Sequence, residues 1–281
     1  MRPLAAVRRV EADLAAAGVP EPRVDAELLV AHVARVSRSA LSALGRELAL
    51  EEVDRLRSLV ERRRSREPLQ HVLGEWGFRR LVLGVDRRAL VPRPETEAVV
   101  ERCLALVAAL AAPRVLDVGT GSGAIALALA DEHRGAVVDA TDASAEALAL
   151  AEENARRTGL ADRVRFTGGD LLAGLRGPFD LVVSNPPYVD EEEIASLEPE
   201  VRDHEPREAL VGPAVTEAIG RAAPAVLAPS GRLVLEVGDD QAPGVARLLA
   251  RLAYEDVTVS PDLAERERVV DGRVAPGAPR R

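Results

Sequence analysis

The residues best suited to chemistry form a rigid turn, Asn185-Pro186-Pro187-Tyr188, directly after an apolar run at 180–184. Two prolines fix φ and remove two N–H donors, so the chain must leave the preceding strand as an extended turn. Asn185 Oδ1 and the Pro186 carbonyl can then accept both hydrogens of an NH2 group, while Tyr188 stacks on its plane. The motif indicates a site where a planar amide or amine nitrogen reacts. An ordinary turn between strand and helix is the alternative.

A glycine-rich loop, Gly119-Thr120-Gly121-Ser122-Gly123, lies earlier in the chain. It follows a β-branched run at 114–118 and precedes an apolar run at 124–130, which predicts strand, loop and helix. Glycines let a ligand approach the backbone, and the start of a helix offers N–H groups to a carboxylate or phosphate. The spacing Gly-x-Gly-x-Gly differs from the dinucleotide fingerprint. Such a loop is weak evidence by itself.

Acidic residues at the ends of two further expected strands add weight to the loop. Asp142 follows the run at 136–141, where its carboxylate can accept hydrogen bonds from both hydroxyls of a ribose. Asp170 stands in the same way after 164–167, next to Leu171 and within reach of an adenine edge. The loop and the two carboxylates together predict an adenosine-containing ligand.

Together these motifs resemble the class I S-adenosylmethionine-dependent methyltransferases, and the Asn-Pro-Pro-Tyr turn resembles those that methylate an amide or exocyclic nitrogen. The segments at 69–74, 90–97 and 182–189 look like signature segments of the peptide chain release factor glutamine methyltransferases, and 17–29 looks like their first segment. The resemblance extends from about residue 4 to about residue 274. Its most specific part is Pro92-Arg93-Pro94-Glu95-Thr96-Glu97 combined with the turn.

The resemblance implies that the protein methylates N5 of the glutamine in the Gly-Gly-Gln motif of class 1 release factors and releases S-adenosylhomocysteine. It assigns the catalytic role to Asn185, Pro186 and Tyr188, and the binding of the substrate amide to the whole turn, Pro187 included. The cofactor S-adenosylmethionine is expected on Gly119, Thr120, Gly121, Ser122, Gly123, Asp142, Asp170, Leu171 and Asn185. Some relatives carry an aromatic residue at the position of Leu171, so apolar packing is the contact expected there. No residue is assigned as a general base.

Other segments of the resemblance leave two interpretations open. Arg93, Glu95 and Glu97 either serve the site or brace the start of the catalytic domain. The segment at 201–206 is either a lid that faces the substrate or a surface loop. His71 and Glu236 are expected to be structural, and 266–273 looks like a degraded form of the family's last strand.

Two other functions fit the same motifs. An amino-methyltransferase of adenine or guanine in DNA or ribosomal RNA would use the same turn, because a flipped base stacks on the same tyrosine. Residues 1–92 carry 17 arginines against 13 acidic residues, whereas residues 93–281 carry 20 against 33. The excess of acidic residues in 93–281, the expected catalytic domain, disfavours nucleic acid as a partner. A non-catalytic protein that binds a release factor or senses the cofactor is the other alternative, and the intact motifs disfavour it.

Composition predicts a soluble, cytoplasmic protein. No run approaches the roughly 18 to 20 apolar residues that span a bilayer, and charged residues interrupt any signal peptide. Cys103 is the single cysteine and fits core packing, while four scattered histidines predict no metal site. All 37 basic residues are arginines, and the cluster at 62–66 is interpreted as a solvated helix face, with contact to a partner as the alternative. A monomer is the expected state.

Periodicity predicts a small helical domain at 1–72, with helices near 4–17, 24–36 and 50–66, as the surface on which the substrate docks. A β-hairpin linker follows at 73–92. From 93 to 274 helices and strands alternate, which predicts a doubly wound, Rossmann-like α/β domain with the seven-stranded sheet of methyltransferases. The tail at 275–281 is expected to be disordered.

Overall fold

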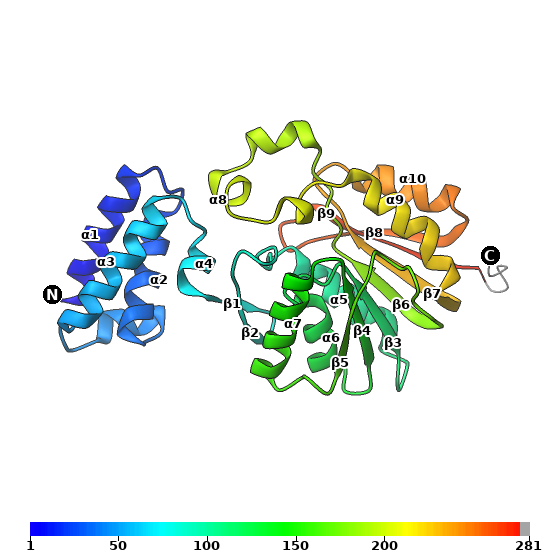
Figure 1. The fold of residues 1–281 in the computed structure, drawn as a ribbon, viewed down its shortest axis with the longest axis horizontal. Coiled ribbons are helices and arrows are strands. Elements are labelled where there is room, and N and C mark those ends of the chain that lie inside the picture. Colours follow the sequence, from blue (N-terminus) through cyan, green and yellow to red (C-terminus); the bar gives the residue numbers. More distant parts are fainter. Residues whose placement is uncertain (276–281) are drawn as a thin grey trace. The chain divides into compact units, whose positions relative to one another are not determined.

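The computed structural model describes residues 1–275, so the expected tail lies outside the described residues apart from Ala275. The chain divides into two compact units (Figure 1). The helical unit is formed by Met1–Glu75 together with Leu197–His204, and the sheet unit by Trp76–Ser196 and the residues from Glu205 onward. The short segment at 197–204 joins the helical unit although it lies far along the sequence.

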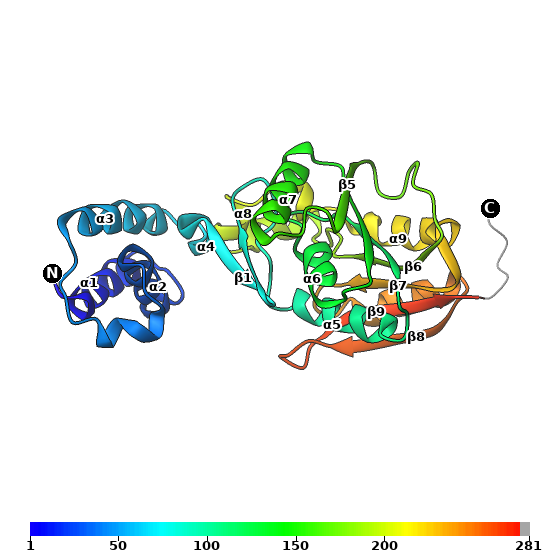
Figure 2. The same cartoon turned by 90° about the horizontal axis from the view of Figure 1, so that it is seen from below.

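The helical unit is built on α1 (Pro3–Ala16), α2 (Pro22–Ala34) and α3 (Leu50–Arg64), which pack on one another (Figure 2). Proline in the first turn of α1 and α2 supplies the φ angle that a helix start needs. Val7, Val10 and Leu14 form the buried stripe of α1, as their spacing predicts, whereas Leu4 is exposed. The unit also contains the 3₁₀ turn η1 (Arg38–Ala43) and the helices α4 (Leu69–Leu73) and α8 (Pro199–Arg202).

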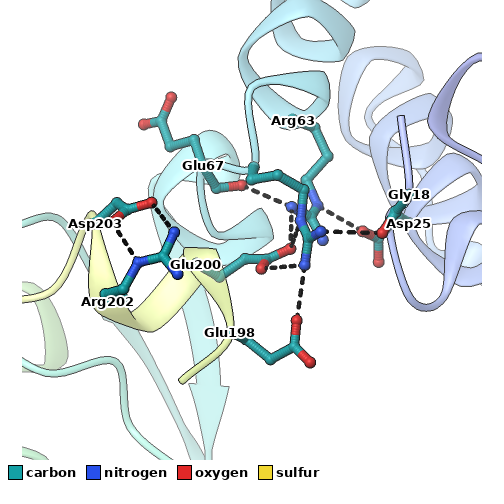
Figure 3. A network of polar contacts seen from close by, with 9 residues as sticks. Gly18, Asp25, Arg63, Glu67, Glu198, Glu200, Arg202 and Asp203 are labelled. Atoms are coloured by element: carbon teal, nitrogen blue, oxygen red, sulfur yellow. Dashed lines mark hydrogen bonds and ion pairs between the residues drawn. The ribbon is translucent and has the colours of Figure 1, made fainter. Parts of the chain in front are cut away.

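A cluster of charges holds α8 within the helical unit (Figure 3). The Arg63 guanidinium donates to Asp25 at 2.7 Å and to Glu200 at 2.8 Å, and only 6% of its side chain is exposed. Arg66 donates to both carboxylate oxygens of Glu200 at 2.6 Å and to Glu198 at 2.9 Å. Burial raises the pKa of Asp25, although the hydrogen bond from Arg63 opposes this. We call Asp25, Arg63, Arg66 and Glu200 the arginine clasp.

The arginine clasp corrects the interpretation of 62–66 as a solvated helix face at two positions, Arg63 and Arg66. Arg63 is buried, Arg66 is mostly covered, and Arg62 pairs with Glu67 and donates to the carbonyls of His71 and Val72. Arg62 and Arg64 keep the exposure of surface residues, since 42% and 45% of their side chains are exposed. The partners come from distant parts of the sequence, so a local charge pattern cannot reveal them.

The sheet unit confirms the doubly wound α/β fold. Its seven strands lie in the order β5-β4-β3-β6-β7-β9-β8, in which β9 pairs antiparallel with both neighbours and the other pairs are parallel. The strands are β3 (Arg114–Val118), β4 (Val137–Asp142), β5 (Val164–Gly168), β6 (Phe179–Ser184), β7 (Leu227–Glu236), β8 (Tyr254–Pro261) and β9 (Glu267–Val274). The expected last strand at 266–273 thus exists as β9.

Helices cover both faces of the sheet (Figure 1). Alternate strand residues point to opposite faces; in β6, Leu181 and Val183 join one apolar core and Val182 joins the other. On the first face lie α5 (Thr96–Val107), α6 (Ala124–Glu132) and α7 (Ala145–Thr158), and on the second α9 (Pro213–Ala222) and α10 (Ala242–Arg251). Cys103 of α5 is fully buried, and burial raises its pKa, as expected of a packing residue.

The hairpin of β1 (Glu75–Phe78) and β2 (Leu81–Gly84) forms a separate two-stranded sheet. Asn154 of α7 fixes its second strand, because its side chain accepts from the Gly84 N–H at 2.7 Å and donates to the Gly84 carbonyl at 3.0 Å. The remaining short turns are η2 (Glu191–Ser196), η3 (Arg207–Ala209) and η4 (Ala223–Ala225). Within residues 1–275, no helix has both the length and the apolar character to cross a membrane.

The arginine clasp makes a stability prediction. Replacing Arg63 with alanine leaves Asp25 buried without its counter-charge, which destabilises a protein by about 3 kcal/mol. Urea unfolding followed by circular dichroism measures this loss. Arg64→Ala is the matched control, because it removes only an exposed pair with Glu61 and changes the unfolding free energy by at most about 0.5 kcal/mol. Equal midpoints for the two variants would show that the clasp does not stabilise the unit.

Candidate active site

Strand pairing brings the two sequence motifs to one edge of the sheet. β3 lies between β4 and β6, and Val118 at its end is in register with Thr141 and with Ser184. The three strands are parallel, so their carboxyl ends and the loops that follow lie together, where open α/β sheets bind ligands. The buried Ser184 hydroxyl donates to the Val118 carbonyl at 2.7 Å, which ties the residue before the Asn-Pro-Pro-Tyr turn to the residue before the glycine loop.

Thr141 and Asp142 hold the glycine loop in place by hydrogen bonds. The N–H groups of Gly119 and Thr120 both donate to the Thr141 carbonyl, at 2.8 and 3.0 Å. Asp142 Oδ2 accepts from the Gly121 N–H at 2.8 Å, and Oδ1 accepts from the Ser144 N–H at 2.9 Å. Each carboxylate oxygen keeps a lone pair for a further donor. Asp142 therefore both fixes the loop and can bind a ligand hydroxyl.

A second carboxylate, Asp117 of β3, binds the loop. Asp117 is fully buried, and its Oδ2 accepts from the Thr120 hydroxyl at 2.6 Å and from the Ala126 N–H at 3.2 Å. Burial raises its pKa to about 7, while the two hydrogen bonds oppose the shift. Sequence reasoning assigned no role to Asp117. An acidic residue inside an otherwise apolar strand, directly before a glycine loop, was the available signal, since a buried carboxylate needs such partners.

Hydrogen bonds with two side chains, those of Gln241 and Thr96, fix the Asn-Pro-Pro-Tyr turn. Gln241 donates from Nε2 to the Tyr188 carbonyl at 3.1 Å and accepts from the Gly238 N–H at 3.1 Å. Asn185 donates from Nδ2 to the Thr96 hydroxyl oxygen at 3.4 Å. Pro186 is buried, whereas Asn185 and Tyr188 are partly exposed. The side chains expected to meet a substrate thus remain accessible while the backbone is fixed, and sequence reasoning missed the contributions of Thr96 and Gln241.

A cavity of about 290 Å³ opens beside the glycine loop, close in size to the smaller ligand pockets of proteins. It brings together most residues predicted to bind cofactor or substrate. These are Gly119, Thr120, Gly121, Ser122, Asp142, Asp170, Leu171, Asn185 and Pro187. Three predicted residues do not line it: Gly123, at the start of α6, and Pro186 and Tyr188, whose turn neighbours Asn185 and Pro187 do line it.

The cavity suits an adenosine-containing cofactor. Gly119 has φ +72° and lines the cavity, and a Cβ built on it meets no atom within 4 Å. The backbone is thus bare where a ligand would approach it. Leu171, with φ +50°, presents an apolar side chain to the same cavity. Among residues 1–275, no group of three or more His, Cys, Asp and Glu side chains is arranged to hold a metal ion.

The 90–97 segment contributes bracing contacts. Arg93 donates to Glu205 Oε1 at 2.7 Å, and burial raises the pKa of Glu205 despite this partner. Glu97 accepts from the Arg79 N–H at 2.8 Å and so fixes the hairpin to α5. Arg93 also lines the cavity beside Leu90, Val91 and Pro92. The geometry therefore gives Glu97 a bracing contact, and gives Arg93 both a bracing contact and a place at the site.

Comparison with known proteins places these features in one family. Residues 5–74 match the model of the PrmC N-terminal domain, and residues 101–199 match that of the methyltransferase small domain. A methyltransferase from Pyrococcus furiosus is similar in fold, with a TM-score of 0.51 and 19% identity over 69% of this chain and 89% of that one.

Two curated relatives are similar along nearly their whole length. The release factor glutamine methyltransferase of Deinococcus radiodurans is 48% identical, over 95% of this chain and 96% of its own. That of Caulobacter vibrioides is 42% identical, over 91% of both chains. This identity over both units shows that the chain belongs to the family of release factor glutamine methyltransferases.

Proposed function

We propose that this protein transfers a methyl group from S-adenosylmethionine to the side-chain nitrogen N5 of the glutamine in the Gly-Gly-Gln motif of class 1 release factors. The products are N5-methylglutamine and S-adenosylhomocysteine. One observation carries the proposal: Asn185, the first residue of the Asn-Pro-Pro-Tyr turn, lines the same cavity as the glycine loop and Asp142. Family membership supports the choice of a release factor as the substrate.

The cofactor is assigned to the cavity residues. The loop at 119–123 would receive its carboxylate end, Asp142 its ribose hydroxyls, and Asp170 with Leu171 its adenine. When bound, the cofactor supplies an electrophilic methyl group on a sulfonium. The residues of this chain would hold the acceptor nitrogen in place for the transfer.

The substrate amide is assigned to the turn. An amide nitrogen is a poor nucleophile because its lone pair is delocalised into the carbonyl. Asn185 Oδ1 and the Pro186 carbonyl would accept its two N–H bonds, which places the nitrogen in line with the methyl group and favours the positive charge that develops on it. Tyr188 would stack on the amide plane, and Pro187 would keep the turn rigid. One C–N bond would form as the bond between the methyl carbon and the cofactor sulfur breaks, and the nitrogen would lose one proton to solvent.

The helical unit, without the segment at 197–204, coincides with the matched N-terminal family domain, and we assign to it the docking of the release factor. The acidic balance of residues 93–281 argues against a stable complex with nucleic acid. Release factors act in translation, so we place the enzyme in the cytoplasm. We propose a monomer, because one chain carries every assigned site residue.

A transfer assay tests the substrate. Labelled methyl from S-adenosylmethionine should appear on a purified class 1 release factor and be absent from the same factor with its Gly-Gly-Gln glutamine replaced by alanine. Asn185→Ala removes an acceptor aimed at the reacting nitrogen and should lower kcat by about 10²–10³-fold. Label on duplex DNA or ribosomal RNA, with none on the release factor, would instead establish an amino-methyltransferase of nucleic acid.

Calorimetric titration with S-adenosylhomocysteine tests the cofactor site. Asp142→Ala removes the acceptor assigned to the ribose and loosens the loop at Gly121, so the Kd should rise by about tenfold or more. Asp162→Ala, which alters an exposed carboxylate outside the cavity, should bind like the parent protein. If both variants bind with the parent Kd, Asp142 does not hold the cofactor.

A further inference from the structure

The proposed reaction needs the Asn185 amide in one of its two orientations. The oxygen end accepts hydrogen bonds and the nitrogen end donates them, and the two ends have nearly the same shape. A substrate NH2 group offers only donors, so it binds the oxygen end and is repelled by the nitrogen end. Rotation of the Asn185 amide by half a turn would thus remove the acceptor without changing the shape of the site. Some neighbour must select the productive orientation.

Thr96 is the neighbour in contact with the amide. It is the first residue of α5, it is buried, and its hydroxyl oxygen lies 3.4 Å from Asn185 Nδ2. A hydroxyl has one proton and two lone pairs, so it can face either end of an amide. The direction of the Thr96 hydroxyl proton therefore decides whether the oxygen or the nitrogen of the Asn185 amide faces Thr96.

Glu236 takes that proton. It is the last residue of β7, only 2% of it is exposed, and a hydrogen bond from the Thr96 side chain acts to lower its pKa. A carboxylate only accepts, so the hydroxyl must donate to Glu236 and offers a lone pair to Asn185. Only the Nδ2 end of the amide can meet a lone pair, which leaves Oδ1 free on the other side. Asn185 itself lines the cavity.

We propose that Thr96 and Glu236 are positioning residues for the methyl transfer, which hold the Asn185 amide with its oxygen toward the substrate. The relay runs from the Glu236 carboxylate through the Thr96 hydroxyl to Asn185 Nδ2. It rests on the proposed role of Asn185. It also gives a reason for the burial of Glu236, whose Oε2 has no hydrogen-bond partner among the described residues. A buried carboxylate is costly unless it is compensated, so its burial here calls for a role of this kind.

The relay depends on the charge of Glu236. Burial raises the pKa of Glu236 to about 7, against the hydrogen bond from Thr96 and the charge of Arg268. Glu95 and Arg93 act on it from the segment before α5, raising and lowering the pKa respectively, and the Tyr188 phenol also feels its charge. Below this pH the protonated carboxyl can donate to Thr96, whose own proton is then free to turn to Asn185. The amide then loses its orientational preference, so kcat should fall as the pH drops through about 7.

A first test needs no catalysis, because the sequence has only two asparagines, Asn154 and Asn185. Protein labelled with ¹⁵N-asparagine gives two side-chain NH2 signals. Thr96→Val, which keeps the shape and removes the hydroxyl, should move the Asn185 signal. The signal of Asn154, which donates to the carbonyls of Gly84 and Ser122, should stay in place as the internal control. An Asn185 signal that is the same in both proteins would overturn the proposal.

The second test is kinetic. With a release factor as acceptor, Thr96→Val should lower kcat by about tenfold with the Kd for S-adenosylhomocysteine within about twofold, and Thr96→Ser should restore most of the rate. In the parent protein the ¹⁵N-asparagine signal of Asn185 should also shift as the pH passes through about 7. Glu236→Gln should abolish both this shift and the fall in kcat near pH 7. Parental kcat in Thr96→Val, or a fall in kcat that persists in Glu236→Gln, contradicts the relay. No transfer by the parent protein contradicts the proposed function instead, and the ¹⁵N result still decides the relay.

Discussion

The parallel pairing of β3 with β4 on one side and with β6 on the other is the constraint on which the site depends. Each strand ends in a different piece of the site: the glycine loop, Asp142 and the Asn-Pro-Pro-Tyr turn. The register aligns Val118 with Thr141 and Ser184, and the Ser184 hydroxyl fixes the last of these contacts. Because parallel strands point their carboxyl ends the same way, pairing alone gathers residues that are far apart in the sequence.

Polar side chains around this edge then fix the positions of the glycine loop, the turn and the Asn185 amide, which strand pairing alone does not determine. The buried Asp117 fixes the Thr120 hydroxyl of the glycine loop, the partly buried Gln241 fixes the Tyr188 carbonyl, and the buried Thr96 contacts the Asn185 amide. The buried carboxylates Asp117 and Glu236 add little to the stability of the fold, because a carboxylate loses its hydration when it is buried, whereas an apolar side chain at the same place would lose none. Their concentration around one edge of the sheet fits a region selected for geometry more than for stability.

Local patterns predicted the fold and most of the cavity. The glycine loop, Asp142, Asp170 and Asn185 each stand beside an apolar strand, so their place at a strand end could be inferred without knowing the partner strands. The pairing of Thr96 with Glu236 and that of Arg63 with Glu200 could not be inferred from the sequence, because the two members of each pair lie more than a hundred positions apart and no local pattern marks them. Arg63 and Arg66 of the cluster at 62–66 were misinterpreted for the same reason, because a run of arginines looks the same whether its partner is water or a buried carboxylate.

The membership of α8 in the helical unit bears on the order in which the protein is made. A ribosome releases the chain from its N-terminus, and a domain whose residues are contiguous can fold as soon as they have emerged. Here Glu200 lies 137 positions after Arg63, beyond β3, β4, β5 and β6. The helices α1, α2 and α3 are therefore synthesised first, but Arg63 and Arg66 can pair with Glu200 only after four strands of the sheet have been made. The helical unit can therefore be completed only after part of the sheet unit has been synthesised.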